Sequence, residues 1–426
     1  GDPDQITITP DTKQGGLRFN WLTDPRVTKT VIQYKVKGAS KWERKTGTYY
    51  VESVTAGYKE KAAHRVEITG LTPSAEYVYR VGDGGEFMSE EKSFTAPKSA
   101  EDKSFKVIFY SDPQSESVEN YMSFKDSIDQ ALKICPKPDL MISAGDTTQN
   151  GYKSTEWEAC FEVMHDYYAK YPTVTVAGNH EMKGDWNFIS FAQRFNMSGA
   201  KTGYPEFDRT MGYFEYGDAI FVILNGEVTP ADKKAEIMKK ELQWCKSVLD
   251  ASDKKWRIVM THAGPYTSNH DPLDVRAYYI NDSEYSLDKM NVDLFLNGHD
   301  HIYIRSTVKN DIKVNTGDGT TYITGGTVGN KFYEYMPARS DYSTDFYVDE
   351  EDKQVFSVIE FSEDSIKGTA YQKQDPDDWN SFTAVDSYEI LNNRQTGKQV
   401  SDYTDVSKNA WYYDAAKYVT DKHLMS

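Results

Sequence analysis

The sequence predicts a multidomain chain in which an all-β module is followed by an α/β domain. Its 426 residues are more than one hydrophobic core usually encloses. Up to about residue 98, short segments alternate apolar and polar residues, which is typical of half-buried strands. After residue 105, continuous apolar runs of strand length alternate with segments of helical spacing, which indicates α/β layers.

The alternation in residues 1–98 predicts a β-sandwich. It is clearest in Leu17, Phe19 and Trp21, in Ile32, Tyr34 and Val36, in Val66 and Ile68, and in Tyr77, Tyr79 and Val81. The segment 71–77, LTPSAEY, resembles the tyrosine corner of fibronectin type III domains, where the Tyr hydroxyl bonds to nearby backbone. This resemblance implies a fibronectin type III-like module. The polar segment 95–104 is predicted to be a linker.

Residues 105–392 are predicted to form the α/β domain. Its strands are expected at 106–112, 140–146, 173–176, 220–225, 257–262 and 292–297, with helices at 118–135, 157–168 and 230–249. A hairpin at 354–361 and 366–371 and a segment at 386–391 are expected to close the domain. Since the strands of such a sheet end at a common crevice, the polar residues at their ends are expected to converge there: Asp112, Asp146, Asn179, His262 and His299.

The charge balance limits the possible partners. With 49 basic and 66 acidic residues the net charge is −17, which argues against a nucleic acid and against an anionic membrane surface. Bound divalent ions can still supply the positive charge that an anionic substrate needs. No apolar run approaches the roughly 18 residues of a membrane span. Cys135, Cys160 and Cys245 are too few and too scattered for a disulfide framework.

Histidines gather in the predicted α/β segments. Five of the eight lie at or after the ends of predicted strands, namely His180, His262, His270, His299 and His301. An Asn and a His at the end of an apolar strand, as in Asn179-His180, suggest a metal-assisted site. In Gly298-His299-Asp300-His301 an extended backbone would place both imidazoles on one side of the chain, which suits two ligands for neighbouring metal ions.

These motifs follow an order that resembles the calcineurin-like metallophosphoesterases. They are Asp112-Pro113-Gln114, Gly145-Asp146, Gly178-Asn179-His180-Glu181, Thr261-His262 and Gly298-His299-Asp300-His301. Within that family the chain most resembles the purple acid phosphatases, in which a fibronectin-like module also precedes the catalytic domain. The resemblance implies a four-layer sandwich of two mixed sheets flanked by helices. It also implies hydrolysis of phosphoesters, with phosphomonoesters in the first place.

The resemblance further implies two metal sites that share one carboxylate, Asp146. One ion would be held by Asp112, Asp146 and His301. The other would be held by Asp146, Asn179, His262 and His299. The ions would be divalent or of mixed valence, with Fe, Zn and Mn as candidates. Two such ions about 3.5 to 4 Å apart lower the pKa of a shared water and clamp the phosphoryl oxygens for in-line attack by hydroxide.

The same resemblance implies three substrate contacts, His180, His270 and Asn179. His180 would protonate the leaving group or orient the phosphate, which makes it the candidate catalytic residue. His270 matches a substrate-contacting His of the phosphatase subgroup, and the alternative for it is an ordinary polar loop residue. The substrate would be a phosphorylated small molecule or polymer.

Two positions depart from the family pattern. Purple acid phosphatases carry a Tyr ligand at the place of Gln149, and the wider family carries a His at the place of Gln114. One metal site is thus short of a ligand, so that a glutamine oxygen or water completes it, or the site is partly degenerate. The alternatives to a phosphomonoesterase are a phosphodiesterase of the same fold and a wall-anchored protein that binds phosphorylated polymer without hydrolysing it.

The end of the chain resembles a different kind of module. The segment 403–419 resembles the opening of an S-layer homology repeat, so residues 401–426 are expected to be a partial repeat. Such repeats attach bacterial proteins to cell-wall polymers. The resemblance therefore implies a secreted protein of the bacterial cell surface, whose full-length S-layer region binds cell-wall polymer. The alternative is an amphipathic helix packed on the main domain, since one face would carry Trp411, Ala415, Tyr418 and Val419.

Overall fold

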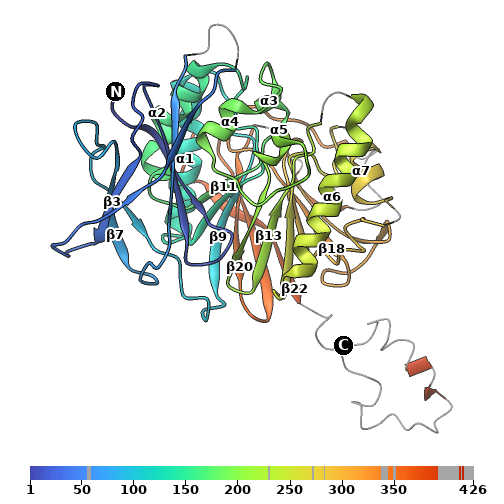
Figure 1. Ribbon diagram of the computed structural model, residues 1–426. Helices are drawn as coiled ribbons and strands as arrows, with labels where there is room; N and C mark the ends of the chain where they lie inside the picture. Colours follow the sequence, from blue (N-terminus) through green and yellow to red (C-terminus); the bar gives the residue numbers. More distant parts are fainter. Residues whose placement is uncertain are drawn as a thin grey trace.

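The fold is known from a computed structural model that describes residues 1–54, 59–228, 231–270, 273–282, 284–336, 344–348 and 352–391, together with Tyr412, Tyr413, Ala415 and Ala416. The strand-rich N-terminal module lies against an α/β domain, as Figure 1 shows. Apart from four residues, the predicted S-layer repeat at 401–426 lies outside the described residues. None of the described helices is long and apolar enough to cross a membrane.

The N-terminal module is a sandwich of two antiparallel four-stranded sheets, in the orders β1-β2-β6-β5 and β4-β3-β7-β8. The strands are β1 Asp4–Pro10, β2 Leu17–Thr23, β3 Val31–Val36, β4 Glu43–Thr46, β5 Thr48–Val51, β6 Ala62–Ile68, β7 Glu76–Gly82 and β8 Lys92–Thr95. Phe19, Trp21 and Tyr79 are fully buried between the sheets. The predicted all-β sandwich is confirmed.

The predicted tyrosine corner is present in this module. The hydroxyl oxygen of Tyr77, in β7, accepts a hydrogen bond of 2.9 Å from the backbone N–H of Thr72. The ring of Tyr77 stacks on Phe94 with centroids 5.3 Å apart, so the residue joins the corner to the core. The sequence signal and the local structure therefore agree.

His64 is a buried titratable group in the same module. Its two ring nitrogens lie 2.8 Å from the hydroxyls of Thr23 and Thr30, and its ring stacks on Trp21. Hydroxyl groups can donate to one ring nitrogen and accept from the other, so the neutral imidazole is satisfied. Burial lowers the pKa of His64 from 6.5 to about 4. The folded module therefore resists protonation at this position.

This burial predicts that stability falls in mild acid. Between pH 6.5 and about 4 the unfolded chain binds a proton at His64 that the folded chain does not bind. The free energy of unfolding should therefore decrease as the pH falls through this window, by up to about 3 kcal/mol. Urea unfolding at neutral pH and at about pH 4.5 measures the change.

A matched pair of variants isolates the contribution of His64. His64→Gln removes the titrating group, and we expect a weaker pH dependence than in the wild type. His165→Gln alters a histidine of α2 whose side chain is 52% exposed, and it should leave the wild-type dependence unchanged. The same loss of stability in acid for the wild type and His64→Gln would show that His64 is not its source.

The first sheet of the α/β domain has six strands in the order β11-β10-β9-β20-β21-β22. Parallel strands form one half, and an antiparallel meander forms the other. The bounds are β9 Phe105–Tyr110, β10 Leu140–Ser143, β11 Thr173–Thr175, β20 Val355–Phe361, β21 Ser365–Lys373 and β22 Phe382–Leu391. The predicted closing hairpin and last strand thus extend the sheet that carries the first ligand loops.

The second sheet has the order β12-β13-β14-β15-β18-β16-β17, with β19 paired to β16. Its four central strands β13, β14, β15 and β18 are parallel. The bounds are β12 Gly212–Tyr216, β13 Ala219–Ile223, β14 Trp256–Met260, β15 Leu294–Asn297, β16 Tyr303–Lys309, β17 Ile312–Lys313, β18 Thr320–Gly325 and β19 Thr344–Tyr347. Both sheets are therefore mixed, as predicted.

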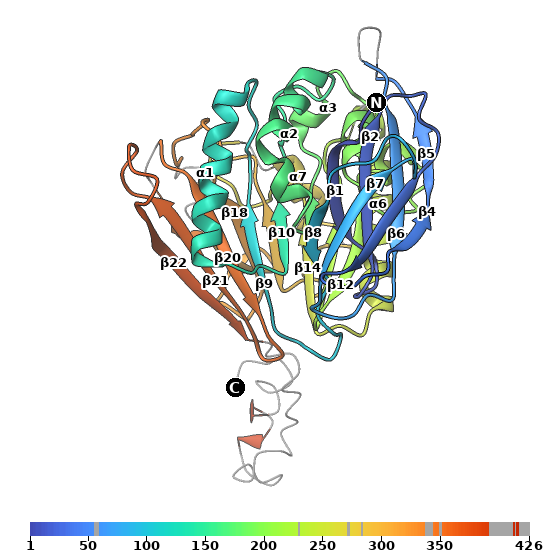
Figure 2. The ribbon, with the colours of Figure 1, turned by 90° about the vertical axis from the view of Figure 1, so that its left-hand side faces the viewer.

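Helices cover the outer faces of the two sheets. α1 and α2 lie over the first sheet (Figure 2), and α6 and α7 lie over the second (Figure 1). The helices are α1 Val118–Ile134, α2 Ser154–Tyr168, α3 Asn179–Met182, α4 Ile189–Arg194, α5 Pro205–Asp208, α6 Lys234–Ala251 and α7 Leu273–Tyr279, and a 3-10 turn at Ala231–Lys233 precedes α6. This is the four-layer sandwich that the sequence predicts.

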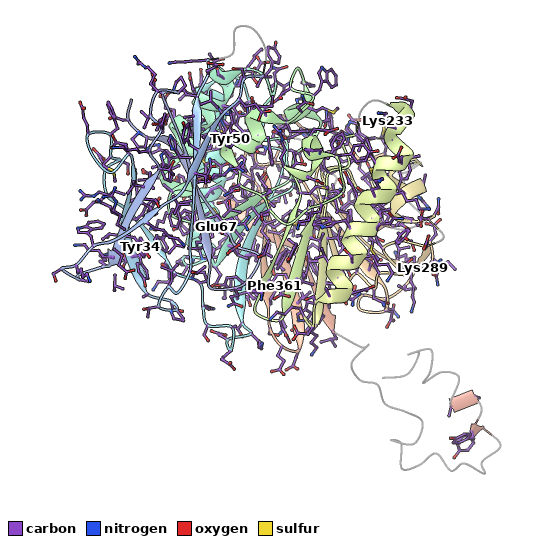
Figure 3. The ribbon with its side chains drawn as sticks, viewed as in Figure 1. Tyr34, Tyr50, Glu67, Lys233, Lys289 and Phe361 are labelled. Carbon is purple, nitrogen blue, oxygen red and sulfur yellow. The ribbon has the colours of Figure 1, made fainter. Side chains whose placement is uncertain are left out.

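Aromatic side chains fill the space between the sheets. Phe361 of β20, labelled in Figure 3, stacks on Phe105 of β9 with ring centroids 4.5 Å apart. It also lies 5.5 Å from the ring of Phe221, in β13 of the other sheet. Packing between the two inner faces fixes the position of one sheet relative to the other. It thereby fixes the loops at their carboxyl ends.

The N-terminal module is joined to the α/β domain by buried polar contacts. The Tyr79 hydroxyl donates a 2.6 Å bond to the carbonyl of Ala169, just after α2. The guanidinium of Arg194, at the end of α4, is 1% exposed and donates a 2.7 Å bond to the side chain of Gln5 in β1. Such buried hydrogen bonds fix the orientation of the two domains.

Candidate metal centre

Four of the six candidate ligands lie in short loops at the carboxyl ends of β9, β10 and β15, whereas His262 follows β14 and Asn179 lies in α3. Asp112, Asp146, His299 and His301 have φ values of 52°, 53°, 74° and 53°. Residues with a side chain rarely adopt this left-handed region, and strained backbone of this kind gathers at functional sites. The same φ values show that the predicted extended backbone for His299 and His301 is wrong.

The reason for that difference is the close approach of two loops. β15 ends at Asn297, and a Cβ on Gly298 would lie 1.9 Å from Ser111 Oγ and 2.6 Å from Asp112 Oδ2. The backbone N–H of His299 turns to donate to Asp112 Oδ2 at 3.0 Å. The chain therefore turns around the Asp112 carboxylate instead of continuing as a strand.

The structure brings five of the predicted ligands into two adjacent clusters. In each cluster the donor atoms lie within 4.8 Å of one another. One cluster is Asp112, Asp146 and His301, and the other is Asp146, His262 and His299. Asp146 belongs to both, which is the position of a bridging ligand. The two histidines of the Gly-His-x-His motif thus go to different clusters, although their roles as ligands remain predictions.

Hydrogen bonds to the far side of two imidazoles fix how they face the clusters. The Nδ1–H of His262 donates to the carbonyl of Ala144 at 2.8 Å, and the Nδ1–H of His301 donates to that of Lys331 at 2.6 Å. A carbonyl can only accept, so in the neutral form of each ring Nε2 carries a lone pair toward the cluster. Burial also lowers the pKa of His299 and of His301 to about 3, which keeps both rings neutral.

The two carboxylates are held in a setting that favours a cation. Burial raises the pKa of Asp112 to about 8, with Asp146 adding to the shift and His262 opposing it. Asp146 Oδ1 accepts a 3.0 Å bond from the N–H of His180, and Oδ2 lies 3.0 Å from His262 Nε2. Two buried acids with carboxylate oxygens within 4.8 Å of each other repel when both are ionised. Positive charge between them removes that cost.

Two buried polar atoms of the site lack a good hydrogen-bond partner within the described part of the chain, which fits a role as metal ligands. Among the described residues, Asn179 Oδ1 is buried without a hydrogen-bond partner, and the neutral His262 Nε2 faces only acceptors such as Asp146 Oδ2 at 3.0 Å. Buried polar atoms are nearly always paired, so these two point to a missing ligand. Carboxylate, carboxamide and imidazole donors suit Mn, Fe and Zn. When bound, two such ions lower the pKa of a shared water and clamp phosphoryl oxygens.

Asn179 and His180 lie in a helix, not at a strand end. β11 ends at Thr175, and α3 runs over Asn179–Met182 with Gly178 as its N-cap. A Cβ on Gly178 would lie 2.2 Å from Asp146 Oδ1, so the close approach requires glycine. The predicted placement of Asn179 and His180 at the end of a strand is therefore wrong. The turn of the helix separates their side chains instead.

His180 lies beside the clusters without being part of them. Its Nδ1–H donates to the carbonyl of Gln149 at 2.8 Å, and its Nε2 lies 3.9 Å from Asp146 Oδ2. The ammonium of Lys183 lies 3.3 Å from the same Nε2. No sequence motif pointed to Lys183, which brings positive charge to the site of a protein whose net charge is −17.

His270 lies at the edge of the second cluster. Its ring packs on His299 with centroids 3.8 Å apart, and its Nδ1–H donates to Asp300 Oδ1 at 2.7 Å. Asp300 also accepts from the backbone N–H groups of Ser268, Asn269 and His270. Asp300 is therefore a positioning residue that the sequence analysis missed. The only sequence signal for Asp300 was its position between the candidate ligands His299 and His301.

Glu181 is a second positioning residue that the sequence analysis missed. Its carboxylate accepts hydrogen bonds from four backbone N–H groups, at 2.7 to 3.0 Å, which belong to Asp146, Thr147, Thr148 and Gly178. It thus ties the loop that carries Asp146 to the turn that carries Asn179. The Glu of the Gly-Asn-His-Glu motif was visible in the sequence, but its contacts with residues 146–148 were not.

A two-sheet α/β sandwich with two clusters of Asp and His that share a carboxylate defines the class of binuclear metallohydrolases. Residues 105–303 match the family described as calcineurin-like phosphoesterase, and residues 3–96 match the purple acid phosphatase N-terminal domain. Residues 105–303 are therefore a calcineurin-like phosphoesterase domain, which makes the chain a hydrolase of phosphoric esters, and its two ligand clusters could hold a binuclear metal centre.

Curated relatives agree with this assignment. The chain is 27% identical to purple acid phosphatase 23 of Arabidopsis thaliana over 381 residues, which covers 77% of this chain and 79% of the relative. It is 23% identical to acid phosphatase type 7 of Homo sapiens over 327 residues, which covers 71% of this chain and 70% of the relative.

Solved structures agree in fold. The purple acid phosphatase PPD1 from yellow lupin (Lupinus luteus) seeds superposes with a TM-score of 0.73 at 14% identity, covering 96% of this chain and 78% of that one. The structure of PhoD superposes with a TM-score of 0.59 at 13% identity, covering 91% of this chain and 93% of that one. At these identities the likeness concerns the fold alone.

Proposed function

We propose that the protein is a phosphomonoesterase of the acid-phosphatase kind that works with two divalent or mixed-valence ions of Fe, Zn or Mn. The observation that carries the proposal is the pair of ligand clusters joined at Asp146, with His180 beside them. The names of the curated relatives, which are acid phosphatases, support the choice of monoesters. The ammonium of Lys183 would attract the dianionic phosphate of such a substrate.

A panel of substrates tests this function directly. The full chain, loaded in turn with Fe, Zn and Mn, is assayed on phosphorylated small molecules, on phosphorylated polymer and on phosphodiesters. We expect monoesters to be hydrolysed with the highest kcat/KM. Faster hydrolysis of diesters would make the protein a phosphodiesterase of the same fold. Binding of phosphorylated polymer with no hydrolysis at any metal loading would support a binding protein.

In this proposal His180 donates a proton to the leaving group, and Asn179 and His270 contact the substrate. A general acid typically contributes about 10²- to 10⁴-fold, and it matters most for a poor leaving group. We therefore expect His180→Ala to slow the hydrolysis of alkyl phosphates far more than that of aryl phosphates with acidic phenols. Measurement of kcat for both substrate series tests this expectation, and metal content should not change.

The control for this variant is His165→Ala, on an exposed position of α2. It should leave the kcat of both substrate series unchanged. An equal fall for both series in His180→Ala, together with loss of metal, would mean that His180 holds a metal ion instead of donating a proton.

We also propose that the protein is secreted and attached to the bacterial cell wall through the S-layer homology region of its full-length form. The likeness of residues 403–419 to the opening of such a repeat supports this proposal. Cell fractionation of the producing bacterium, with a form lacking residues 401–426 and everything beyond them as control, tests it. The full-length protein should sediment with purified walls and the shortened form should not. Equal release of both forms would contradict wall attachment.

A further inference from the structure

We propose that the side-chain oxygen of Gln114 is the fourth protein ligand of the first metal ion, beside Asp112, Asp146 and His301, and that this oxygen-rich set selects a divalent ion. The inference rests on the binuclear site of the proposed function, but it does not depend on which ester the site hydrolyses. Gln114 and Gln149 both depart from the family pattern, and the proposal gives the ligand role to Gln114 alone.

The position of Gln114 is the first observation. The residue follows β9 by four positions and is 4% exposed, so its carboxamide is buried in the site. One end of the amide lies 3.1 Å from His301 Nε2 and 3.5 Å from Asp146 Oδ2. Both of these atoms belong to the first cluster. Gln114 thus reaches the same point as the predicted ligands.

The groups around the other end of the Gln114 carboxamide determine which amide atom faces the cluster. That end lies 2.9 Å from the backbone carbonyl of Asp112 and 3.3 Å from that of Asp146. Carbonyl oxygens only accept, so the amide nitrogen must lie there and donate to both. The amide oxygen is therefore the atom that faces His301 and Asp146.

This orientation brings three acceptors to one point. His301 Nε2 carries a lone pair, because its Nδ1–H donates to Lys331. Gln114 Oε1 and Asp146 Oδ2 likewise have only lone pairs to offer. Three such atoms cannot bond to one another, and together they repel. A cation between them satisfies all three, and a carboxamide oxygen is a ligand that Mn²⁺, Mg²⁺ and Ca²⁺ accept.

The charge of the ligand set indicates the valence of the ion. Asp112 and Asp146 supply two negative charges, whereas Gln114 and His301 are neutral. A phenolate at position 149 would have added a third negative charge, which suits a ferric ion. The side chain of Gln149 makes no hydrogen bond to the described residues, and its backbone carbonyl is used by His180. The two negative charges of this ligand set therefore neutralise a divalent ion.

Metal binding by the metal-stripped full chain tests the proposal without any phosphatase assay. The dissociation constants of Mn²⁺ and Zn²⁺ are measured by calorimetry and chelator competition, and circular dichroism monitors folding. Gln114→Leu keeps the size of the side chain but removes the oxygen. We expect it to weaken one of the two sites at least about 10-fold, the smallest loss typical for residues that support a metal. Gln149→Leu is the matched control and should bind both ions as the wild type does.

Two further measurements keep the proposal falsifiable. Gln114→His keeps an N–H for the carbonyl oxygens of Asp112 and Asp146 and offers a ring nitrogen to the cluster, so it should shift the preference of the first site from Mn²⁺ toward Zn²⁺; an unchanged preference would overturn the proposal even if Gln114→Leu fails to fold. Wild-type affinity in Gln114→Leu, or a loss in Gln149→Leu, would also overturn it. Wild-type protein loaded with iron should lack a visible phenolate-to-iron band, and such a band would overturn the divalent assignment. A failure to hydrolyse monoesters would leave all of these outcomes unaffected.

Discussion

Asp146→Asn is expected to abolish phosphoester hydrolysis and to strip the protein of metal. Asp146 is the one carboxylate that belongs to both ligand clusters. The substitution keeps its size and the oxygen that accepts the His180 N–H at 3.0 Å, but it removes the negative charge shared by the two ions. We expect kcat/KM to fall by at least about 10³-fold, since the attacking water is then no longer activated by two ions.

The experiment combines activity, metal analysis and the folding of the remote module. Metal per chain should fall well below that of the wild type, while near-UV circular dichroism, to which buried Trp21 of the remote module contributes, should keep the signal of a folded chain. Asp377→Asn makes the same chemical change at an exposed loop and should have wild-type metal content. Full activity with intact metal content in Asp146→Asn would show that the bridging role is misassigned.

Glu181→Leu is expected to cause the largest loss of stability outside the apolar cores. The Glu181 carboxylate accepts bonds from the N–H groups of Asp146, Thr147, Thr148 and Gly178, and Leu would leave all four without this partner. An unpaired buried N–H costs about 1 to 3 kcal/mol, so the total loss should be on the order of 4 kcal/mol or more. Urea unfolding measures it.

In Glu181→Leu, metal affinity should fall together with stability, because the same four hydrogen bonds position the loop of Asp146 and the turn before Asn179. Glu181→Gln keeps one accepting oxygen and should lie between the wild type and Glu181→Leu in both properties. Glu158→Leu, at an exposed position of α2, is the matched control and should change neither. If Glu181→Leu kept wild-type stability and metal affinity, the carboxylate would not organise the site.

Much of the fold could be predicted because it depends on short-range patterns. The alternation around Phe19 and Trp21 predicts one sandwich, and the apolar runs that end near Asp112, Asp146 and His262 predict the second domain. The Tyr77 corner could be predicted in detail since its partner, Thr72, lies five residues away. Local sequence determines such features because the interacting groups are neighbours in the chain.

Other features depend on contacts between distant parts of the chain. The left-handed backbone of His299 results from Asp112, which accepts its N–H across 187 positions. Glu181 gains its role from residues 34 and 35 positions earlier, which only the packing of β10 beside β11 brings near. Neither hydrophobic periodicity nor secondary-structure propensity encodes contacts between residues so far apart in the chain.

The sequence by itself determined which residue types stand at the ends of the strands, and thereby the chemistry of Asp112, Asp146, His262 and His299. It did not determine whether Gln114 or Gln149 reaches the metal site, because both follow a strand by a few residues. The tertiary structure decided this: the amide of Gln114 lies between two backbone carbonyls and His301, from loops of different sheets. Orientation of a ligand follows from the groups around it, and these come together only when the two sheets pack.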